Sequence, residues 1–274
     1  MAQTVRPTRA PKPTRKPPRV TLPYPLNLWQ SAIGRKWIMA LSGIGLVGFV
    51  LAHMIGNLHL YEGPVETYHY AEVLREIGAP VIPHTVFLWI MRIGLIAMFG
   101  LHIASARSLQ DMSRRANPKS NLVDSNKQYA GSQDFVAANY ASRTMRWTGP
   151  IIGLFLLWHL ADLTWGWLNP DFVKGDPYHN VSASLSSLPV AILYIVANLA
   201  LAVHLFHGIF SVFQSLGVNS PKINAIRRPL AIAVAGIILV GNLSFPILTQ
   251  AGVIDDDGID VFESGEAAEL EAAE

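Results

Sequence analysis

Four histidines lie deep inside four separate apolar stretches of this chain. They are His53, His102, His159 and His204, and each stretch is long enough to cross a bilayer. An imidazole is costly to bury in hydrocarbon, so an ionisable side chain at such a depth indicates a functional site. Four of them, one per helix, predict two sites for a metal or a haem held between helices.

The composition favours a membrane protein. Of the 274 residues, 51% are hydrophobic and 15% are charged, whereas a soluble domain has about a quarter charged residues. A transmembrane helix needs about 20 mostly apolar residues, and five windows reach that length: 37–60, 84–107, 147–168, 188–216 and 229–249. The sequence therefore predicts an all-α integral membrane bundle of five transmembrane helices, within an anchor domain at 31–250.

Basic residues gather in segments that lie on one side of such a bundle. They occur in the proline-rich arm 1–30, in the connection 108–146 and after the fourth window, whereas the tail 251–274 is strongly acidic. The positive-inside rule puts the N-terminus in the cytoplasm and the C-terminus outside. Beside a membrane bundle, the basic arm favours contact with anionic lipid or a partner protein over nucleic acid. Between the first two windows, 65–77 is expected to form a short interfacial helix.

The absence of cysteine restricts the chemistry of the chain. It excludes disulfides and a thiol nucleophile. It also means that the chain alone cannot supply the thiolates of a conventional iron–sulfur cluster.

The helical rise converts residue number into depth. From the cytoplasmic ends of their helices, His53 lies about 24 Å and His159 about 18 Å into the membrane, whereas His102 lies about 9 Å and His204 about 18 Å in. This order favours an outer pair, His53 with His159, and an inner pair, His102 with His204. Imidazoles from two helices suit the axial positions of a haem, because a neutral nitrogen donor binds iron without adding charge in lipid.

Three further polar residues in these windows allow more than one interpretation. His207, one turn from His204, is a ligand, a donor that supports a ligand, or a quinone contact. Arg92, about 24 Å from the inner end, binds the propionates of an outer haem, pairs with Asp162, or extends toward the interface. Asp162, about 22 Å deep, also has the options of relaying protons or binding iron directly.

The histidine-bearing segments have a recognisable order. They read MALSGIGLVGFVLAHMIGN at 39–57, GLHIASAR at 100–107, YASRTMRWTG at 140–149 with WHLAD at 158–162, and HLFHGIFSVFQSLG at 204–217. Together they resemble the succinate dehydrogenase/fumarate reductase cytochrome b membrane anchor in its single-chain, five-helix, di-haem form. The resemblance covers roughly 30–250, with all four helix histidines in register.

The resemblance implies a multi-pass protein of the bacterial inner (plasma) membrane. Such an anchor docks a flavoprotein subunit and an iron–sulfur subunit on its cytoplasmic face and passes electrons to a quinone, here expected to be menaquinone. It is the quinone-reducing side of succinate dehydrogenase (respiratory complex II), and the succinate chemistry belongs to the partner, so no catalytic residue is expected here. The segment 108–146, with Tyr140, is expected to form much of the docking surface.

The resemblance also implies ligand roles. His53 and His159 would hold an outer haem b, and His102 and His204 an inner one. Ser31 and Arg35 resemble the serine and arginine of the proximal quinone pocket. The alternative is that Ser31 starts a helix and that Arg35 is a positive-inside anchor.

Two alternatives stay open from the sequence. His159 with Asp162, and His204 with His207, stand at i,i+3 and could each chelate one iron. A His-ligated, Rieske-like 2Fe–2S centre or another non-haem iron centre is therefore an alternative to haem, its shell completed by a carboxylate or by cysteine from a partner. The alternative functions are the anchor of a fumarate reductase and a cofactor-free membrane scaffold.

Overall fold

The computed structural model describes residues 22–116 and 135–255, and within them the side chains up to 112 and from 144. Every regular element in this part of the chain is helical, as predicted. The elements are η1 (Leu26–Gln30), α1 (Ala32–Asn57), η2 (Leu58–Tyr61), α2 (Pro64–Glu76), α3 (Val86–Ala116), α4 (Phe135–Leu163), α5 (Pro177–Ser186), α6 (Leu188–Ser215) and α7 (Pro221–Gln250). Most of the predicted arm, acidic tail and docking segment lies outside the described residues.

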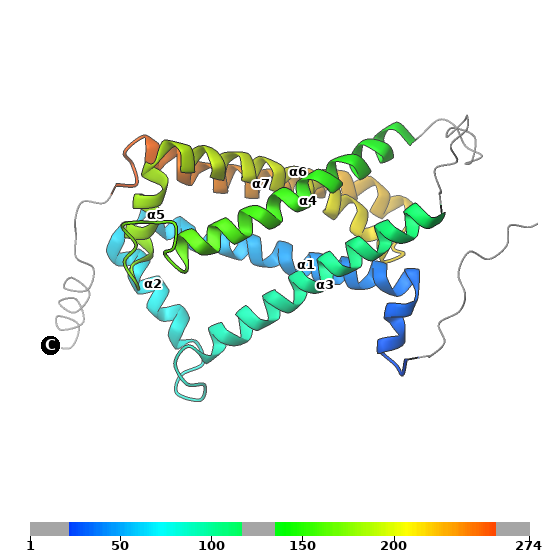
Figure 1. Ribbon diagram of the computed structural model, residues 1–274, viewed down its shortest axis with the longest axis horizontal. Coiled ribbons are helices and arrows are strands. Elements are labelled where there is room, and N and C mark those ends of the chain that lie inside the picture. The colour runs from blue at the N-terminus through cyan, green and yellow to red at the C-terminus, as the bar shows by residue number, and fades with distance from the viewer. Residues whose placement is uncertain (1–21, 117–134, 256–274) are drawn as a thin grey trace, which may run out of the picture.

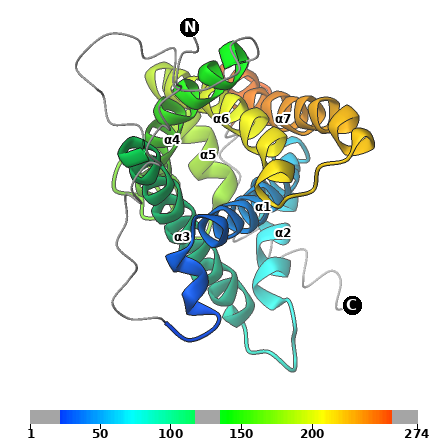
Figure 2. The same cartoon turned by 90° about the vertical axis from the view of Figure 1, so that its right-hand side faces the viewer.

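Five long helices, α1, α3, α4, α6 and α7, run alternately in opposite directions along the long axis (Figure 1). The start of α1, the end of α3 and the start of α4 lie together at one end of the molecule, and α2 and α5 lie at the other. The most extensive contacts join α6 to α7, α1 to α3 and α4 to α6. Viewed along the bundle in Figure 2, α1 lies near the middle, and it also contacts α6 and α7.

Within the described residues, four helical segments are long and apolar enough to cross a membrane: Ala32–Tyr61, Val86–Met112, Leu188–Ser215 and Pro221–Gln250. They correspond to four of the five predicted windows, and the chain is a membrane protein. The remaining long helix, α4, is less apolar because it carries Arg146, Pro150, His159 and Asp162. Large hydrophobic side chains such as Ile93 and Ile96 of α3 are exposed on the bundle surface, which is the expected position for contact with lipid tails.

The helix ends differ from the predicted windows for local reasons. Helix α1 begins at Ala32 because Ser31 caps it, its hydroxyl accepting the Gly34 N–H at 2.9 Å. Similarly, α7 begins with Pro221 after the capping residue Ser220. The window 147–168 is wrong at its end: α4 ends at Leu163, and the chain then turns through Gly166 with φ of 68°, a conformation that glycine adopts without strain.

Two short helices, α2 and α5, cover the end of the bundle at which α1 finishes. The helix predicted at 65–77 is present as α2, and its interfacial position stays a prediction, whereas α5 was not predicted. The two contact each other, and α5 also contacts α4, α6 and α7. Buried Tyr178 and Leu185 of α5 join Met54, Leu60, Tyr194, Phe245 and Ile254 in an apolar cluster at this end.

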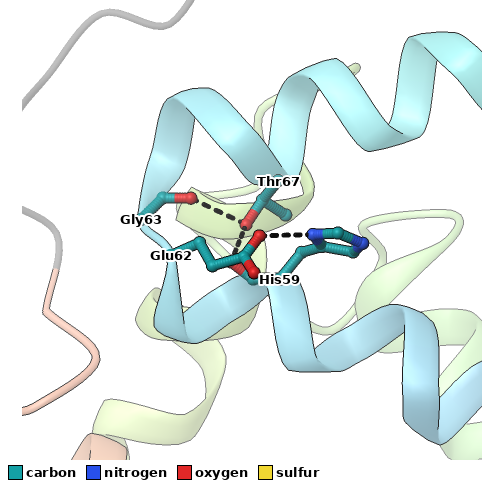
Figure 3. Close-up of polar contacts among 4 residues, drawn as sticks. All are labelled: His59, Glu62, Gly63 and Thr67. Atoms are coloured by element: carbon teal, nitrogen blue, oxygen red, sulfur yellow. Dashed lines mark hydrogen bonds and ion pairs between the residues drawn. The ribbon is translucent and has the colours of Figure 1, made fainter.

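A polar turn joins the end of α1 to α2 (Figure 3). The Thr67 hydroxyl donates to the carbonyl oxygens of His59 at 3.0 Å and Gly63 at 2.8 Å. The His59 Nδ1 atom lies 2.6 Å from Glu62 Oε2, and its ring stacks on Tyr70 at a centroid distance of 4.3 Å. These contacts hold α2 across the bundle rather than along it.

Candidate metal centres

The four helix histidines form two pairs. His53 of α1 faces His159 of α4 with ring centroids 6.0 Å apart and an interplanar angle of 80°. His102 of α3 faces His204 of α6 at 6.3 Å and 65°. Each pair joins the two residues that the depth order places together.

The spacing of both pairs fits one metal atom between two imidazoles. An imidazole nitrogen binds a first-row metal at about 2 Å, and the ring centre lies about 1 Å further away, so two opposed ligands have centroids about 6 Å apart. The backbones fit as well: within the described chain, neither α1 with α4 nor α3 with α6 is a closely packed helix pair. The imidazoles therefore bridge wider spaces between helices, as the axial ligands of a flat macrocycle must.

The inner pair is oriented by hydrogen bonds at Nδ1. The His102 Nδ1 atom lies 3.1 Å from the carbonyl oxygen of Met39. A carbonyl only accepts, so the hydrogen of the neutral ring is on Nδ1 and the lone pair is on Nε2. On the partner ring, the His204 Nδ1 atom lies 3.2 Å from the Thr148 hydroxyl, which donates its own hydrogen to the Thr144 carbonyl. Thr148 therefore accepts from His204, and both rings keep Nε2 free to bind metal.

The outer pair has a different environment. The His159 Nδ1 atom lies 3.3 Å from the Tyr194 hydroxyl oxygen, and Tyr194 donates to Oδ2 of Asp162 at 2.8 Å. The Ser184 hydroxyl donates to the same oxygen at 2.6 Å. The His53 ring is stacked on Phe49 at 5.4 Å.

The other predicted site residues are distributed along the bundle. Ser31 caps α1, and the Arg35 side chain, 8% exposed, donates to the Trp29 carbonyl at 2.6 Å and to the Ser108 hydroxyl at 2.5 Å. Arg35 therefore ties the entrance of α1 to α3.

Arg92 lies over the Trp89 ring with its guanidinium carbon 5.0 Å from the centroid. Since Asp162 accepts from Ser184 and Tyr194 instead, the Arg92–Asp162 ion pair is not formed in the described chain. His207 lies on α6 one turn beyond His204, with its ring 5.1 Å from that of Phe206.

The residues that orient the histidines were not identified from the sequence. Thr148, Tyr194 and Ser184 are buried or partly buried polar side chains, and two of them lie in apolar windows. A polar group in a membrane helix needs a partner. The sequence therefore gave a reason to expect that Thr148 and Tyr194 form hydrogen bonds inside the bundle. Ser184 belongs to α5, a helix that apolar windows do not reveal.

Comparison with known families gives one match. Residues 126–243 match the family model of the succinate dehydrogenase/fumarate reductase transmembrane subunit. Over this segment the chain is similar to that family of membrane subunits. The matched segment includes His159, His204 and His207, whereas His53 and His102 precede it. Comparisons with curated proteins and with solved structures gave no match.

The matched family consists of membrane subunits of succinate dehydrogenase and fumarate reductase, and the match supports the resemblance drawn from the sequence. Each histidine pair would suit a haem, because it supplies two nitrogen ligands and porphyrin supplies the other four.

Proposed function

We propose that this succinate dehydrogenase/fumarate reductase transmembrane subunit holds two haems b and passes electrons from the iron–sulfur subunit to menaquinone or another quinone. His53 and His159 are the ligands of the outer haem, and His102 and His204 those of the inner one. The observation that carries the proposal is the spacing of the two imidazole pairs, 6.0 and 6.3 Å between centroids. The physiological direction is succinate oxidation, with fumarate reduction as the alternative.

A bound haem supplies a one-electron carrier inside the bilayer, and the chain's own residues do the rest. Met39, Thr148 and Tyr194 accept the Nδ1–H groups and so direct the Nε2 lone pairs between the helices. Phe49 and Phe155 pack against the outer imidazoles, which excludes water from that site. A dry, apolar shell is one of the means by which a protein sets a redox potential.

The topology belongs to the same proposal. We take α4 as the fifth transmembrane helix, with the N-terminus in the cytoplasm and the C-terminus outside the bacterial plasma membrane. The polar residues of α4 support this, because Thr148, His159 and Asp162 all have partners within the bundle and so need not face lipid. The flavoprotein and iron–sulfur subunits dock at the cytoplasmic end, where basic residues gather.

The quinone site is proposed at the inner entrance of α1. Ser31 and Arg35 supply a hydroxyl and a guanidinium there, and the Trp29 ring lies 5.7 Å from the Arg35 guanidinium carbon. Hydrogen-bond donors beside an aromatic ring are suited to bind a quinone carbonyl and its ring face. His207 is proposed as a contact to the quinone or to the inner haem, and Arg92 as a contact to the propionates of the outer haem.

The test uses the complete complex purified from membranes. Pyridine-haemochrome spectra, total iron and acid-labile sulfide are measured for wild type, His53→Ala, His102→Ala and the control His84→Ala. His84 is exposed in the connection before α3, so its variant should keep the wild-type haem content. We expect two haems in wild type and loss of one in each ligand variant.

Three results would contradict the proposal in different ways. Sulfide above the complement of the soluble partners, without haem, would replace haem with an iron–sulfur centre, for which Asp162 and His207 are the candidate extra ligands. A complex with neither haem nor additional iron would be a cofactor-free scaffold. Normal spectra and normal quinone reduction in both His53→Ala and His102→Ala would refute their ligand roles.

A further inference from the structure

Asp162 is a carboxylate buried inside the bundle. Its side chain is 2% exposed, and in the described part of the chain its hydrogen-bond partners are hydroxyl groups rather than basic side chains. Ser184 and Tyr194 donate to the same oxygen, Oδ2, at 2.6 and 2.8 Å. A carboxylate at this depth is costly without a cation, which indicates that its position serves the neighbouring centre.

Tyr194 connects this carboxylate to His159. The single hydroxyl hydrogen of Tyr194 is donated to Asp162, so its oxygen is left to accept the Nδ1–H of His159 at 3.3 Å. Although Asp162 and His159 are three residues apart on α4, the link between them passes through α6. Asp162 therefore sets the direction of both hydrogen bonds, the one from Tyr194 to Asp162 and the one from His159 to Tyr194.

Among the residues that the structure describes, the inner pair has no equivalent link. There the Nδ1–H groups meet a backbone carbonyl, that of Met39, and a hydroxyl, that of Thr148. All three acceptors are neutral, but the Tyr194 hydroxyl alone donates in turn to a carboxyl group. Hydrogen bonds to an ionised acceptor are roughly twice as strong as neutral ones, so the Asp162 carboxylate polarises the Tyr194 hydroxyl and makes it a better acceptor for His159. Partners of this kind raise the basicity of a histidine ligand.

We propose that Asp162 is a positioning residue that acts through Tyr194 on His159. It selects the tautomer with a free Nε2, orients the ring toward His53 and raises the electron density of that nitrogen. A more basic ligand stabilises the oxidised form of iron, so the relay lowers the reduction potential of the outer centre and leaves the inner one unaffected. This inference rests on the proposed function, because it requires an iron centre at His159.

The experiment compares wild type, Asp162→Asn, Tyr194→Phe and the double variant as complete complexes. Potentiometric titration followed by absorbance gives the midpoint potential of each centre, and electron paramagnetic resonance of the oxidised complex reports the ligand field of each iron. We expect both single variants to shift the outer potential upward, with the inner potential and signal unchanged. The double variant should shift no further than Tyr194→Phe, because Asp162 acts only through Tyr194. The matched variant Thr148→Val should alter the inner centre alone.

Either of two results would overturn the relay. One is an unchanged outer potential and signal in both single variants at full haem content, and the other is an additive shift in the double variant. If Asp162→Asn fails to assemble, Tyr194→Phe decides alone, since it removes one hydroxyl and keeps the ring. Failure of the proposed function is distinguishable, because wild type itself would then lack the membrane haem before any variant is compared.

Discussion

A neutral imidazole buried in a helical bundle has one hydrogen to donate, and its acceptor decides which nitrogen remains free. In this protein a carbonyl, a threonine and a tyrosine serve as acceptors for three of the four helix histidines. Metal-binding histidines commonly use the second nitrogen in this way, and the supporting contact contributes to affinity. Losing such a partner typically weakens metal binding about 10–100-fold, so the acceptors belong to the proposed sites as much as the ligands do.

Gly43 gives a residue-scale prediction for the inner site. A Cβ atom there would lie 3.2 Å from Cε1 and 3.5 Å from Nδ1 of His102, so Gly43→Ala should displace the ring by a few tenths of an ångström. We expect an altered absorption and paramagnetic resonance signal of the inner centre and a loss of about 1 kcal/mol of stability. In the control Gly149→Ala the new Cβ would lie 3.9 Å from Cε1 of His204, an ordinary contact. Equal effects of the two variants would count against this packing argument.

The sequence indicated the histidines because their cost in lipid makes them conspicuous. It did not indicate that Tyr194 would meet His159, or that Thr148 would meet His204. Those contacts span 35 and 56 residues, and they depend on the rotation of each helix about its axis. Apolar windows report where a helix crosses the membrane, but a helix that is apolar on all sides gives no periodicity from which to read that rotation.

At the scale of whole elements, apolar windows located the long helices but could not locate α5. The windows located α1, α3, α6 and α7, and they placed the end of α4 too late. Helix α5 has ten residues and buries Asn180, Ser182 and Ser184, so a polar face points inward and hydrophobicity does not reveal it. Its buried polar side chains nevertheless matter, because Ser184 reaches Asp162.

The contact between α1 and α2 supplies an element-scale prediction. A Cβ on Gly56 would lie 2.6 Å from the Tyr70 hydroxyl and 3.0 Å from its ring, and a rigid aromatic side chain cannot easily move aside. Gly56→Ala should therefore displace α2, disturb the Tyr70–His59 stack and cost about 1–3 kcal/mol. The control Gly48→Ala has nothing within 4 Å of the new Cβ and should gain up to about 1 kcal/mol from helix propensity. Thermal loss of haem absorbance in the purified complex measures both, and a Gly56→Ala complex as heat-resistant as the Gly48→Ala complex would contradict the prediction.

The whole molecule combines two helix pairs through its histidines. The α1–α3 pair and the α4–α6 pair are each closely packed, and each histidine pair takes one ring from either side. Bound haem would therefore join the two halves, and its removal should loosen their association more than it loosens either half. Ligand binding to the folded state alone stabilises a protein in this way. Complexes prepared with and without haem are heated, and hydrogen exchange is followed by mass spectrometry. Removal of haem should reduce the protection of backbone amides more where α1 faces α4 than within either helix pair.

The orientation in the membrane can be tested directly because the chain contains no cysteine. Lys174 is exposed before α5, at the end that carries α2, and Asn219 is exposed between α6 and α7. If the N-terminus is cytoplasmic, five crossings place Lys174 outside and Asn219 inside.

A membrane-impermeant maleimide should then label Lys174→Cys in intact cells, and Asn219→Cys only after lysis and solubilisation. The wild-type chain provides a background without thiols. Labelling of Asn219→Cys but not Lys174→Cys in intact cells would reverse the orientation. Labelling of both would mean that the segment between these positions, which contains α5 and α6, crosses the membrane an even number of times.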